Sequence, residues 1–370
     1  MLPVPHDPRT VTNARAATVP VRVSPVLDAK PWGGRRLAQW GIALPPGEAI
    51  GEAHLAAPDA MVVTGALQGR TLGELARGDP ASWVGPQGLR ATGGRSIFPL
   101  LIKLITSETH LSIQVHPDDR AALAAGIGTG KTEAYHILDA DPGSVLYLGL
   151  LPGVAMSEFR EACRREDGSA AALMRQTPVR PGMTMLIPAG AAHAPGAGIT
   201  LYEIQQPSNV TFRLDDWGRT DEDGQRRTLH HEAGFGVLDP GLRPEPVPRV
   251  GAPVWPAGRE LLVATPFFAL EKVRPTSGVA TEFPETGSPT VLTCLAGQAR
   301  VEAGTQTVEF GRGMSVVVPV DCATRLQSKM GAVVLRGWVP DLAREIVAPL
   351  RAAAVSEQVL QGLGAYLSLE

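Results

Sequence analysis

The chain has 370 residues and a composition that excludes a largely helical protein. Gly and Pro contribute 41 and 33 residues, about a fifth of the chain, against an expected share of about 12%. Both residues interrupt helices. A hydrophobic share of 44% with 19% charged residues predicts a globular, turn-rich and mainly β protein. At roughly 100 to 200 residues per domain, this length predicts two or three domains.

Charge and cysteine content narrow the possible partners. With 34 basic and 37 acidic residues the net charge is −3, and no run of Lys and Arg stands out, so we expect no nucleic-acid partner. The three cysteines are far apart and suit neither a disulfide framework nor a thiolate zinc site, which favours a reducing cytoplasm. No stretch approaches the roughly 18 apolar residues of a membrane helix, and the N-terminus has no signal-like apolar core. We therefore expect a cytoplasmic protein without a membrane partner.

The first half of the chain reads mainly as short strands. Residues 31–41 predict a turn followed by one helical turn. The ranges with strand character are 100–106, 111–116, 133–140 and 144–150, the last two forming a hairpin around Asp141-Pro142-Gly143. A short helix is expected at 117–126, since Pro and two Asp stand in its first turn. The strongest helical pattern covers 156–176.

Later segments continue the strand pattern on both sides of a linker. Short strands are expected within 182–193, 199–206 and 210–217. Six prolines between Pro240 and Pro256 then favour an extended, semi-rigid connector. Strands resume from about residue 261 to 335, and an Ala- and Leu-containing helical stretch ends the chain.

An internal repeat indicates two related β domains. The pattern Gly182-x5-Pro188-x-Gly190-x2-His193 recurs as Gly313-x5-Pro319-x-Asp321-x2-Thr324, with an apolar strand between the glycine and proline turns of each copy. Two double-sheet β rolls are the economical interpretation. We expect an N-terminal arm at 1–21 and a metal-binding domain at 22–235, with a helical insert at about 154–177. A proline-rich linker follows at 236–258, and a second, degenerate domain with a C-terminal helical segment covers 259–370.

Several predicted strands place metal-binding residue types on one face. Alternation in LSIQVHP puts Ser112, Gln114 and His116 on the face opposite three aliphatic residues. A strand of this kind either turns its polar face to water or lines a cavity, and the strand alone favours water. Three other strands also place polar or ligand-type residues on one face. One carries Lys131 and Glu133, the second carries His193, and the third carries Asn209, Thr211 and Arg213. If these faces converge in one barrel, the candidate ligand set is Gln114, His116, Glu133 and His193.

Two imidazoles, one carboxylate and one amide oxygen suit a borderline divalent metal such as zinc. A doubly charged ion with a single carboxylate ligand leaves the site with a charge of about +1, which favours anionic oxygens in a ligand. The competing interpretation is two hydrogen-bonded histidines and a surface glutamate. The chelate-like spacing and the Gly-Pro-Gly-His turn argue against it.

Together, five motifs resemble the type I phosphomannose isomerases, which are mannose-6-phosphate isomerases of the cupin superfamily. In chain order they are FPLLIKLI, LSIQVHPDD, GKTEAYHILDADPG, IPAGAAHA and EIQQPSNVTFRLDDWGR. The resemblance is densest from Phe98 to Arg219 and continues more weakly through PWGG and GEAHLAAP upstream. It implies a mainly β, bicupin-like fold of two jelly-roll domains with a short helical insertion in the first.

The resemblance also implies an activity and its residues. Members interconvert mannose 6-phosphate and fructose 6-phosphate, so the expected partner is a small phosphosugar and the expected cofactor is one Zn²⁺ or another divalent metal. The zinc ligands of the family fall on the set assembled above, its catalytic arginine on Arg213 and its lysine on Lys131. Two positions depart from the family pattern: Asn209 stands where Asp is usual, and His136 where an aromatic residue is usual. Asn209 weakens any role for a carboxylate at that position.

An aldose-ketose isomerisation moves a proton between C1 and C2 through an enediolate, and it needs a base. Lys131 is one candidate if nearby positive charge lowers its pKa, and a metal-activated water or Glu203 are the alternatives. Arg213 would stabilise the developing negative charge. Ser112 and Lys103 are our candidates for binding the phosphate. Lys103 interrupts an apolar run, and an equally good interpretation is that its side chain only extends from the core to water.

Two other functions remain compatible with the sequence. One is an iron-dependent cupin dioxygenase with a His-His-Glu set. The Lys and Arg on the polar faces argue against it, because they indicate an anionic substrate. The other is a non-catalytic sugar-phosphate-binding protein, which Asn209 favours. No pattern assigns a role to His54 or to His136, and the sequence does not distinguish a monomer from a homodimer.

Overall fold

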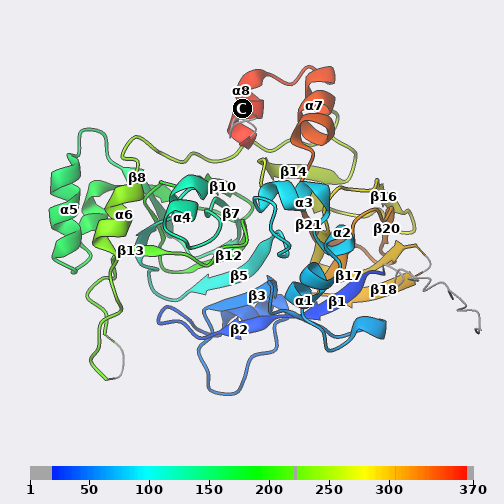
Figure 1. Cartoon of the computed structure of the whole chain (residues 1–370), viewed down its shortest axis with the longest axis horizontal. Coiled ribbons are helices and arrows are strands. Elements are labelled where there is room, and N and C mark those ends of the chain that lie inside the picture. The colour runs from blue at the N-terminus through cyan, green and yellow to red at the C-terminus, as the bar shows by residue number, and fades with distance from the viewer. Residues whose placement is uncertain (1–18, 221–222, 305, 365–370) are drawn as a thin grey trace, which may run out of the picture.

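The computed structural model describes residues 19–220, 223–304 and 306–364, which form two β units side by side (Figure 1). The first unit has two antiparallel sheets, as expected of a jelly roll. The six-stranded sheet has the order β10 (Thr184–Ile187), β7 (Glu133–Ala140), β12 (Ile199–Gln205), β5 (Leu101–Ser107), β3 (Glu52–Ala56) and β2 (Val26–Asp28). The five-stranded sheet has the order β13 (Phe212–Asp215), β6 (Ile113–Val115), β11 (His193–Pro195), β8 (Val145–Leu150) and β9 (Met174–Pro178).

The second unit is built on a ten-stranded sheet. Its main path is β14 (Arg259–Ala264), β15 (Ala269–Val273), β21 (Ala332–Trp338), β17 (Thr290–Ala303), β19 (Ser315–Val318), β1 (Val21–Ser24) and β4 (Met61–Val62). The remaining strands, β16 (Thr281–Phe283), β18 (Gln306–Gly311) and β20 (Thr324–Gln327), pair beside this path. Two N-terminal strands thus belong to the C-terminal sheet, and the predicted domain division along the chain stays a prediction.

Short helices cover the edges of the two units. They are η1 (Arg36–Trp40), η2 (Gly65–Leu67), α1 (Leu72–Gly78), α2 (Pro80–Trp83), α3 (Gly85–Ala91), α4 (Asp119–Ala124), α5 (Met156–Arg164), η3 (Ser169–Leu173), α6 (His231–Val237), the π-helical η4 (Leu342–Val347), α7 (Ala348–Ala352) and α8 (Glu357–Leu363). The sequence did not predict α1 to α3. The helical insert is also shorter than predicted, because Met174–Pro178 pairs with β8 as strand β9.

The predicted hairpin at 133–150 is wrong. Strand β7 pairs with β10 and β12, whereas β8 pairs with β9 and β11 in the other sheet. The turn at residues 141–143 therefore carries the chain from one sheet of the roll to the other. A turn sequence shows that the chain reverses, but it does not specify which strand the next one pairs with. The turn residues therefore could not distinguish a hairpin from a connection between two sheets.

The two copies of the internal repeat adopt matching conformations. Gly182 and Gly313 both have left-handed backbone, with φ of 85° and 79°, just before β10 and β19. Gly190 has φ of 87°, and Asp321 takes the same left-handed region at 58°. The turns that follow lead into β11 and β20. The repeated pattern therefore corresponds to a repeated strand–turn–strand unit.

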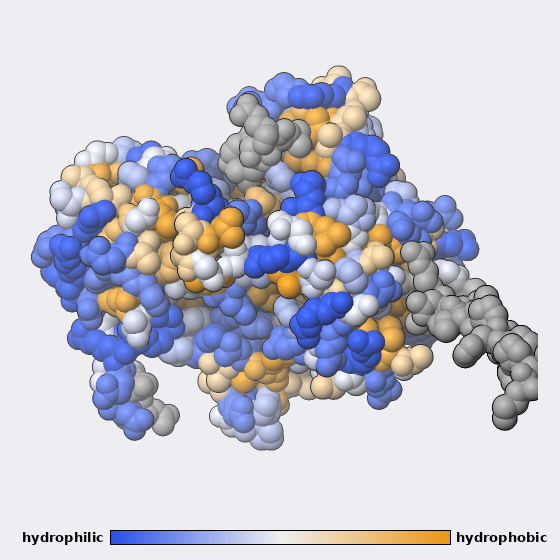
Figure 2. All heavy atoms as spheres, viewed as in Figure 1, coloured by the Kyte–Doolittle hydropathy of each residue, from blue (hydrophilic) through white to orange (hydrophobic). Residues whose placement is uncertain are grey.

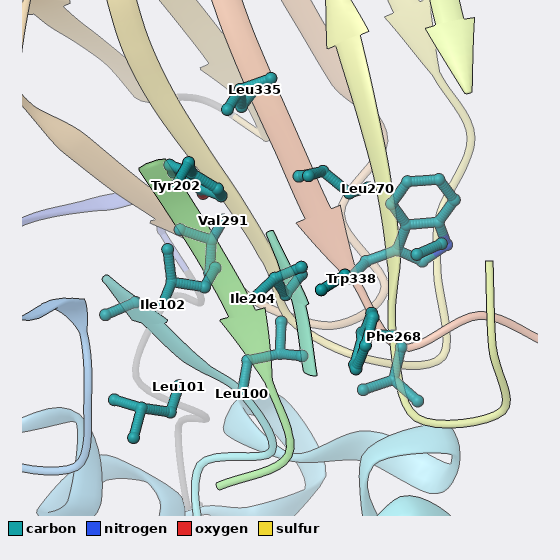
Figure 3. Close-up of a cluster of buried hydrophobic side chains, with 14 of the residues drawn as sticks. Leu100, Leu101, Ile102, Tyr202, Ile204, Phe268, Leu270, Val291, Leu335 and Trp338 are labelled. Carbon is teal, nitrogen blue, oxygen red and sulfur yellow. The ribbon is translucent and has the colours of Figure 1, made fainter. Parts of the chain in front are cut away.

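The core continues across both units (Figure 3). Ile102 and Ile204, on the outer face of the six-stranded sheet, pack with Leu270, Val291 and Trp338 of the second unit. Every residue of β5 and β12 is buried, because one face of this sheet meets the second unit and the other faces the interior of the roll. Lys103 on β5 and Glu203 on β12, which have the opposite parity to Ile102 and Ile204, consequently point into the roll.

On the outside, polar and charged residues cover most of the face in Figure 2, with smaller hydrophobic groups between them. Within the described ranges, no helix has the length and apolar character needed to cross a membrane.

Candidate metal centre and active site

Four side chains from the two sheets converge inside the first β unit. Gln114 on β6 pairs directly with His193 on β11, and His116 follows β6. Glu133 begins β7 in the opposite sheet. The ligand atoms of His116, Glu133 and His193 all lie within 4.8 Å of one another, and the three side chains are fully buried. The structure thus brings together the residues that the strand pattern had assembled.

The free atoms of this cluster fit a metal ion. Neither ring nitrogen of His116 has a hydrogen-bond partner among the described residues. His193 Nδ1 lies 3.0 Å from the carbonyl oxygen of Ala191, so Nδ1 carries the hydrogen and Nε2 presents its lone pair. His193 Nε2 and His116 Nε2 lie 3.0 and 3.5 Å from Glu133 Oε1. Tetrahedral ligands about 2.1 Å from a divalent ion stand about 3.4 Å apart, so these separations suit such an ion.

Gln114 completes the cluster as an amide ligand candidate. Its Nε2 lies 3.1 Å from His193 Nε2, and its Oε1 accepts a hydrogen bond of 3.2 Å from Ser112 Oγ. The two ends of an amide have nearly the same shape, and rotating the amide exchanges oxygen and nitrogen. The Ser112 hydroxyl therefore helps to orient Gln114, and the phosphate contact predicted for Ser112 stays a prediction.

Electrostatics keep the candidate ligands in the forms that a metal needs. Burial lowers the pKa of His116 to about 3, with a further contribution from Lys131, so the imidazole is neutral. Burial alone would raise the pKa of Glu133, but the Lys131 ammonium 3.0 Å away and the neighbouring imidazoles hold this pKa well below its usual range. The Tyr135 hydroxyl also donates a hydrogen bond to Glu133 Oε1. A carboxylate and the neutral imidazole of His116 therefore meet the His193 ring at one point.

A cavity of about 330 Å³ lies next to the metal cluster. Its wall contains six of the predicted site residues and several that the sequence had not indicated. The predicted ones are Lys103, Ser112, Gln114, Lys131, Glu203 and Arg213, together with Asn209 and Thr211 from the same strand as Arg213. The unpredicted ones include Asp28, Lys30, Trp32, Glu52, His54, Tyr135 and Arg227. This volume matches the lower end of the range for small-molecule sites.

Lys103 lies between two carboxylates on the floor of the cavity. Its Nζ is 3.2 Å from Glu52 Oε2 and 3.4 Å from Glu203 Oε2. Burial would lower the pKa of Lys103, but Glu203 and Glu52 raise it above the ordinary value, so the ammonium persists. Burial raises the pKa of Glu203 to about 7 despite the opposing effect of Lys103. Glu203 can therefore exchange a proton near neutral pH.

Arg213 and Arg227 form another part of the cavity wall. The Nη1 of Arg213 donates to the carbonyl oxygen of Thr228 at 2.7 Å, and its buried Nε has no hydrogen-bond partner in the described part of the chain. Arg227 is held by Asp216 through a 2.8 Å bond from Nε, and its guanidinium lies 5.0 Å from the ring centre of Trp32. This wall supplies fixed positive charge to an anionic ligand.

Sequence reasoning missed Glu52 and His54, although a signal was present. In GEAHLAAP these residues are two apart, so a strand places them on one face, as for Ser112, Gln114 and His116. No local feature indicated which cavity that face would line.

Comparison with known proteins decides the family. A protein from Streptococcus mutans described as mannose-6-phosphate isomerase is 31% identical over 309 residues, which cover 81% of this chain and 92% of that protein. The chain belongs to the mannose-6-phosphate isomerase family. A mannose-6-phosphate isomerase from Bacillus subtilis is 33% identical over 232 residues, which are 62% of this chain and 70% of that protein. No family model matches the chain.

Solved structures of the mannose-6-phosphate isomerase family agree with the fold. The crystal structure of the Bacillus subtilis enzyme has a TM-score of 0.72 at 25% identity, and the match covers 86% of this chain and 99% of that one. A putative mannosephosphate isomerase from Archaeoglobus fulgidus shares the fold at 22% identity, with a TM-score of 0.67 over 88% of this chain and 99% of that one. The predicted resemblance and the mainly β, cupin-type fold are confirmed.

Proposed function

We propose that this chain is a metal-dependent aldose-ketose isomerase that interconverts mannose 6-phosphate and fructose 6-phosphate. The observation that carries the proposal is the buried convergence of His116, Glu133 and His193 beside a cavity of about 330 Å³ with cationic walls. Family membership supports the reaction, and the charged groups of the cavity support an anionic sugar as substrate.

The metal would be a single Zn²⁺ held by Gln114, His116, Glu133 and His193. Nitrogen and oxygen ligands of this kind suit zinc, which when bound supplies a Lewis acid for the two substrate oxygens at C1 and C2. With one carboxylate among the ligands, the centre retains a charge of about +1 and attracts negative charge that develops on those oxygens.

Glu203 is the base that the cavity supports best. Its pKa of about 7 lies near the working pH of a general base, and its buried Oε2 has no hydrogen-bond partner among the described residues. The Glu203 carboxylate would take the proton from C2, leaving the electron pair in an enediolate, and then return a proton to C1, while the hydroxyl proton on O2 passes to O1, so that C2 becomes the ketone carbon and C1 the alcohol. Lys131 is already paired with Glu133 at 3.0 Å, so its role is to supply fixed charge.

Arg213 and Arg227 are better placed for the phosphate than the two residues suggested by the sequence. Ser112 is hydrogen-bonded through its hydroxyl to the Gln114 amide, and Lys103 is shared by two carboxylates. The guanidinium groups of Arg213 and Arg227 line the same cavity and present donors in a planar arrangement that suits phosphate oxygens.

A coupled assay that supplies mannose 6-phosphate and follows fructose 6-phosphate tests this function. We expect turnover that is lost on chelation and restored by Zn²⁺. Absence of turnover in the metal-loaded protein would overturn the proposal. Oxygen consumption with iron would instead identify an oxygenase, and binding of mannose 6-phosphate without turnover would identify a sugar-phosphate-binding protein.

A further inference from the structure

A row of polar side chains crosses the six-stranded sheet on its cavity face. In the pairing register, Tyr135 on β7 lies opposite Glu203 on β12, Glu203 opposite Lys103 on β5, and Lys103 opposite His54 on β3. Strands β12, β5, β3 and β2 follow one another toward the edge of the sheet (Figure 1). The row therefore runs from Tyr135, which is hydrogen-bonded to Glu133 of the metal cluster, toward the edge strand β2.

Neighbouring side chains in this row are paired at close range, His54 with Glu52 by a hydrogen bond and Lys103 with Glu52 and Glu203 as ion pairs. His54 Nε2 lies 3.1 Å from Glu52 Oε2, Lys103 Nζ lies 3.2 Å from the same oxygen, and Glu203 Oε2 lies 3.4 Å from Lys103 Nζ. All four side chains are buried, with at most 8% of any residue exposed. We refer to His54, Glu52, Lys103 and Glu203 as the polar row.

The polar row ends at water. The carboxylate of Asp28, on the edge strand β2, lies within 4.8 Å of ligand atoms of both Glu52 and His54. Its side chain is 37% exposed and is also paired with Lys30 at 2.6 Å. His54 is therefore the inner neighbour of a solvated group, whereas Glu203 is almost completely buried.

The composition of the row exceeds what an ion pair requires. One carboxylate would neutralise the Lys103 ammonium, yet two carboxylates contact it and a histidine contacts one of them. Additional buried ionisable groups are costly unless they have partners. Other charged or ionisable groups on the cavity wall are Lys30, Lys131, Tyr135, Arg213 and Arg227. In the described part of the chain none of them is hydrogen-bonded to or ion-paired with His54 or Glu52, although Lys30 helps to lower the pKa of Glu52. A sheet that needed only stability would not require this sequence of donors and acceptors.

We propose that Glu52 and His54 form a proton-exchange path between solvent at Asp28 and the base Glu203. The inference rests on the proposed isomerase function. Its consequence is that the hydrogen removed from C2 is replaced by a solvent hydrogen before a proton is returned to C1. Glu52 and His54 do not touch the reacting atoms and act through Lys103 and Glu203.

Each transfer conserves protons and electrons. Glu203 takes a proton from C2, and the electron pair of the broken C–H bond remains in the enediolate. Lys103 gives a proton to Glu52 and takes the one on Glu203, while Glu52 gives a proton to His54 and His54 releases one to water. The reverse sequence brings a solvent proton to Glu203, so that every group regains its starting state and no oxidant or co-reactant is needed.

Mannose 6-phosphate carrying deuterium at C2 tests the path in ordinary water with the metal-loaded full chain. Mass spectrometry of fructose 6-phosphate measures the fraction of deuterium retained at C1. We expect low retention in the wild type, and retention raised several-fold in His54→Gln and in Glu52→Gln. His136→Gln is the matched control, since His136 lies on the other face of the same sheet, hydrogen-bonded to Thr184 at 2.9 Å. Its retention is expected to equal that of the wild type.

The outcomes separate the path from the function. Turnover in the wild type with high retention would overturn the path and leave the isomerase function intact. Equal, low retention in the wild type and in both row variants would do the same. Lack of turnover in the wild type would overturn both proposals. If His54→Gln does not fold, as judged by thermal unfolding, Glu52→Gln alone decides, because it keeps the size of the side chain.

Discussion

Replacing Glu203 with Gln tests the central step of the proposed reaction. The substitution keeps the shape of the side chain but removes its ability to accept a proton. Positioned general bases contribute about 10² to 10⁴ in rate, so we expect kcat to fall by that factor. Binding of substrate and metal is expected to persist, because Glu203 is not among the candidate ligands.

The pH dependence gives the sign of the effect. Glu203 acts as a base only when it is ionised, and its pKa is raised to about 7. At pH 6 about a tenth of the groups are then ionised, so kcat/KM of the wild type is expected to rise with pH and level off above about pH 8. In Glu203→Gln this rising limb is expected to disappear from the residual activity.

The coupled assay between pH 5 and 9, about the range over which such a group titrates, measures both effects. Glu108→Gln is a suitable control, since Glu108 is paired with Arg36 at 3.2 Å outside the cavity. Activity of Glu203→Gln within a few-fold of the wild type, with the limb near pH 7 retained, would refute the assignment and shift the role of base to Lys131.

Three further outcomes follow from the packing and charges described above. His193→Ala is expected to lose bound metal by elemental analysis, whereas His110→Ala keeps it; metal retained in the first variant would contradict the ligand set. Gly182→Ala is expected to cost about 1 kcal/mol in unfolding free energy because of its positive φ. Gly313→Ala should cost more, since its Cβ would lie 2.6 Å from the backbone oxygen of Trp40, whereas at Gly182 the nearest atom is a flexible arginine end. Burial alone would raise the pKa of Glu52, but Lys103, His54 and Lys30 together lower it below 4.5. The unfolding free energy should therefore decrease as the pH falls below about 4.5, and chemical denaturation should show a weaker decrease in Glu52→Gln.

The metal cluster could be predicted because its signals are local. Gln114 and His116 share a strand face, and the glycine and proline turns before His193 specify where its strand begins. Such spacing depends only on strand geometry. Their convergence with Glu133 required the further assumption that the strands close into one roll, which the repeat and the composition made reasonable.

The rest of the site depends on pairings that a single sequence does not encode locally. Glu52, Lys103 and Glu203 stand on strands that are far apart in the chain and meet only through the order β12, β5, β3. The same limit explains the failed hairpin at 133–150, where the turn was recognised but its sheet was not. The position of the Lys103 side chain was ambiguous, because the sequence pattern of a lysine in an apolar run is the same whether the side chain reaches water or lines a cavity.

The second β unit has a physical role although its described residues form no such metal cluster. Thr324 stands where His193 stands in the first copy, and its hydroxyl donates to the carbonyl oxygen of Cys322. What the second unit does provide is an apolar surface for Ile102 and Ile204 on the outer face of β5 and β12. Because residues alternate along a strand, covering that face with Trp338 and its neighbours directs Lys103 and Glu203 into the roll. The degenerate half of the chain thereby holds in place the sheet on which the proposed base and the polar row depend.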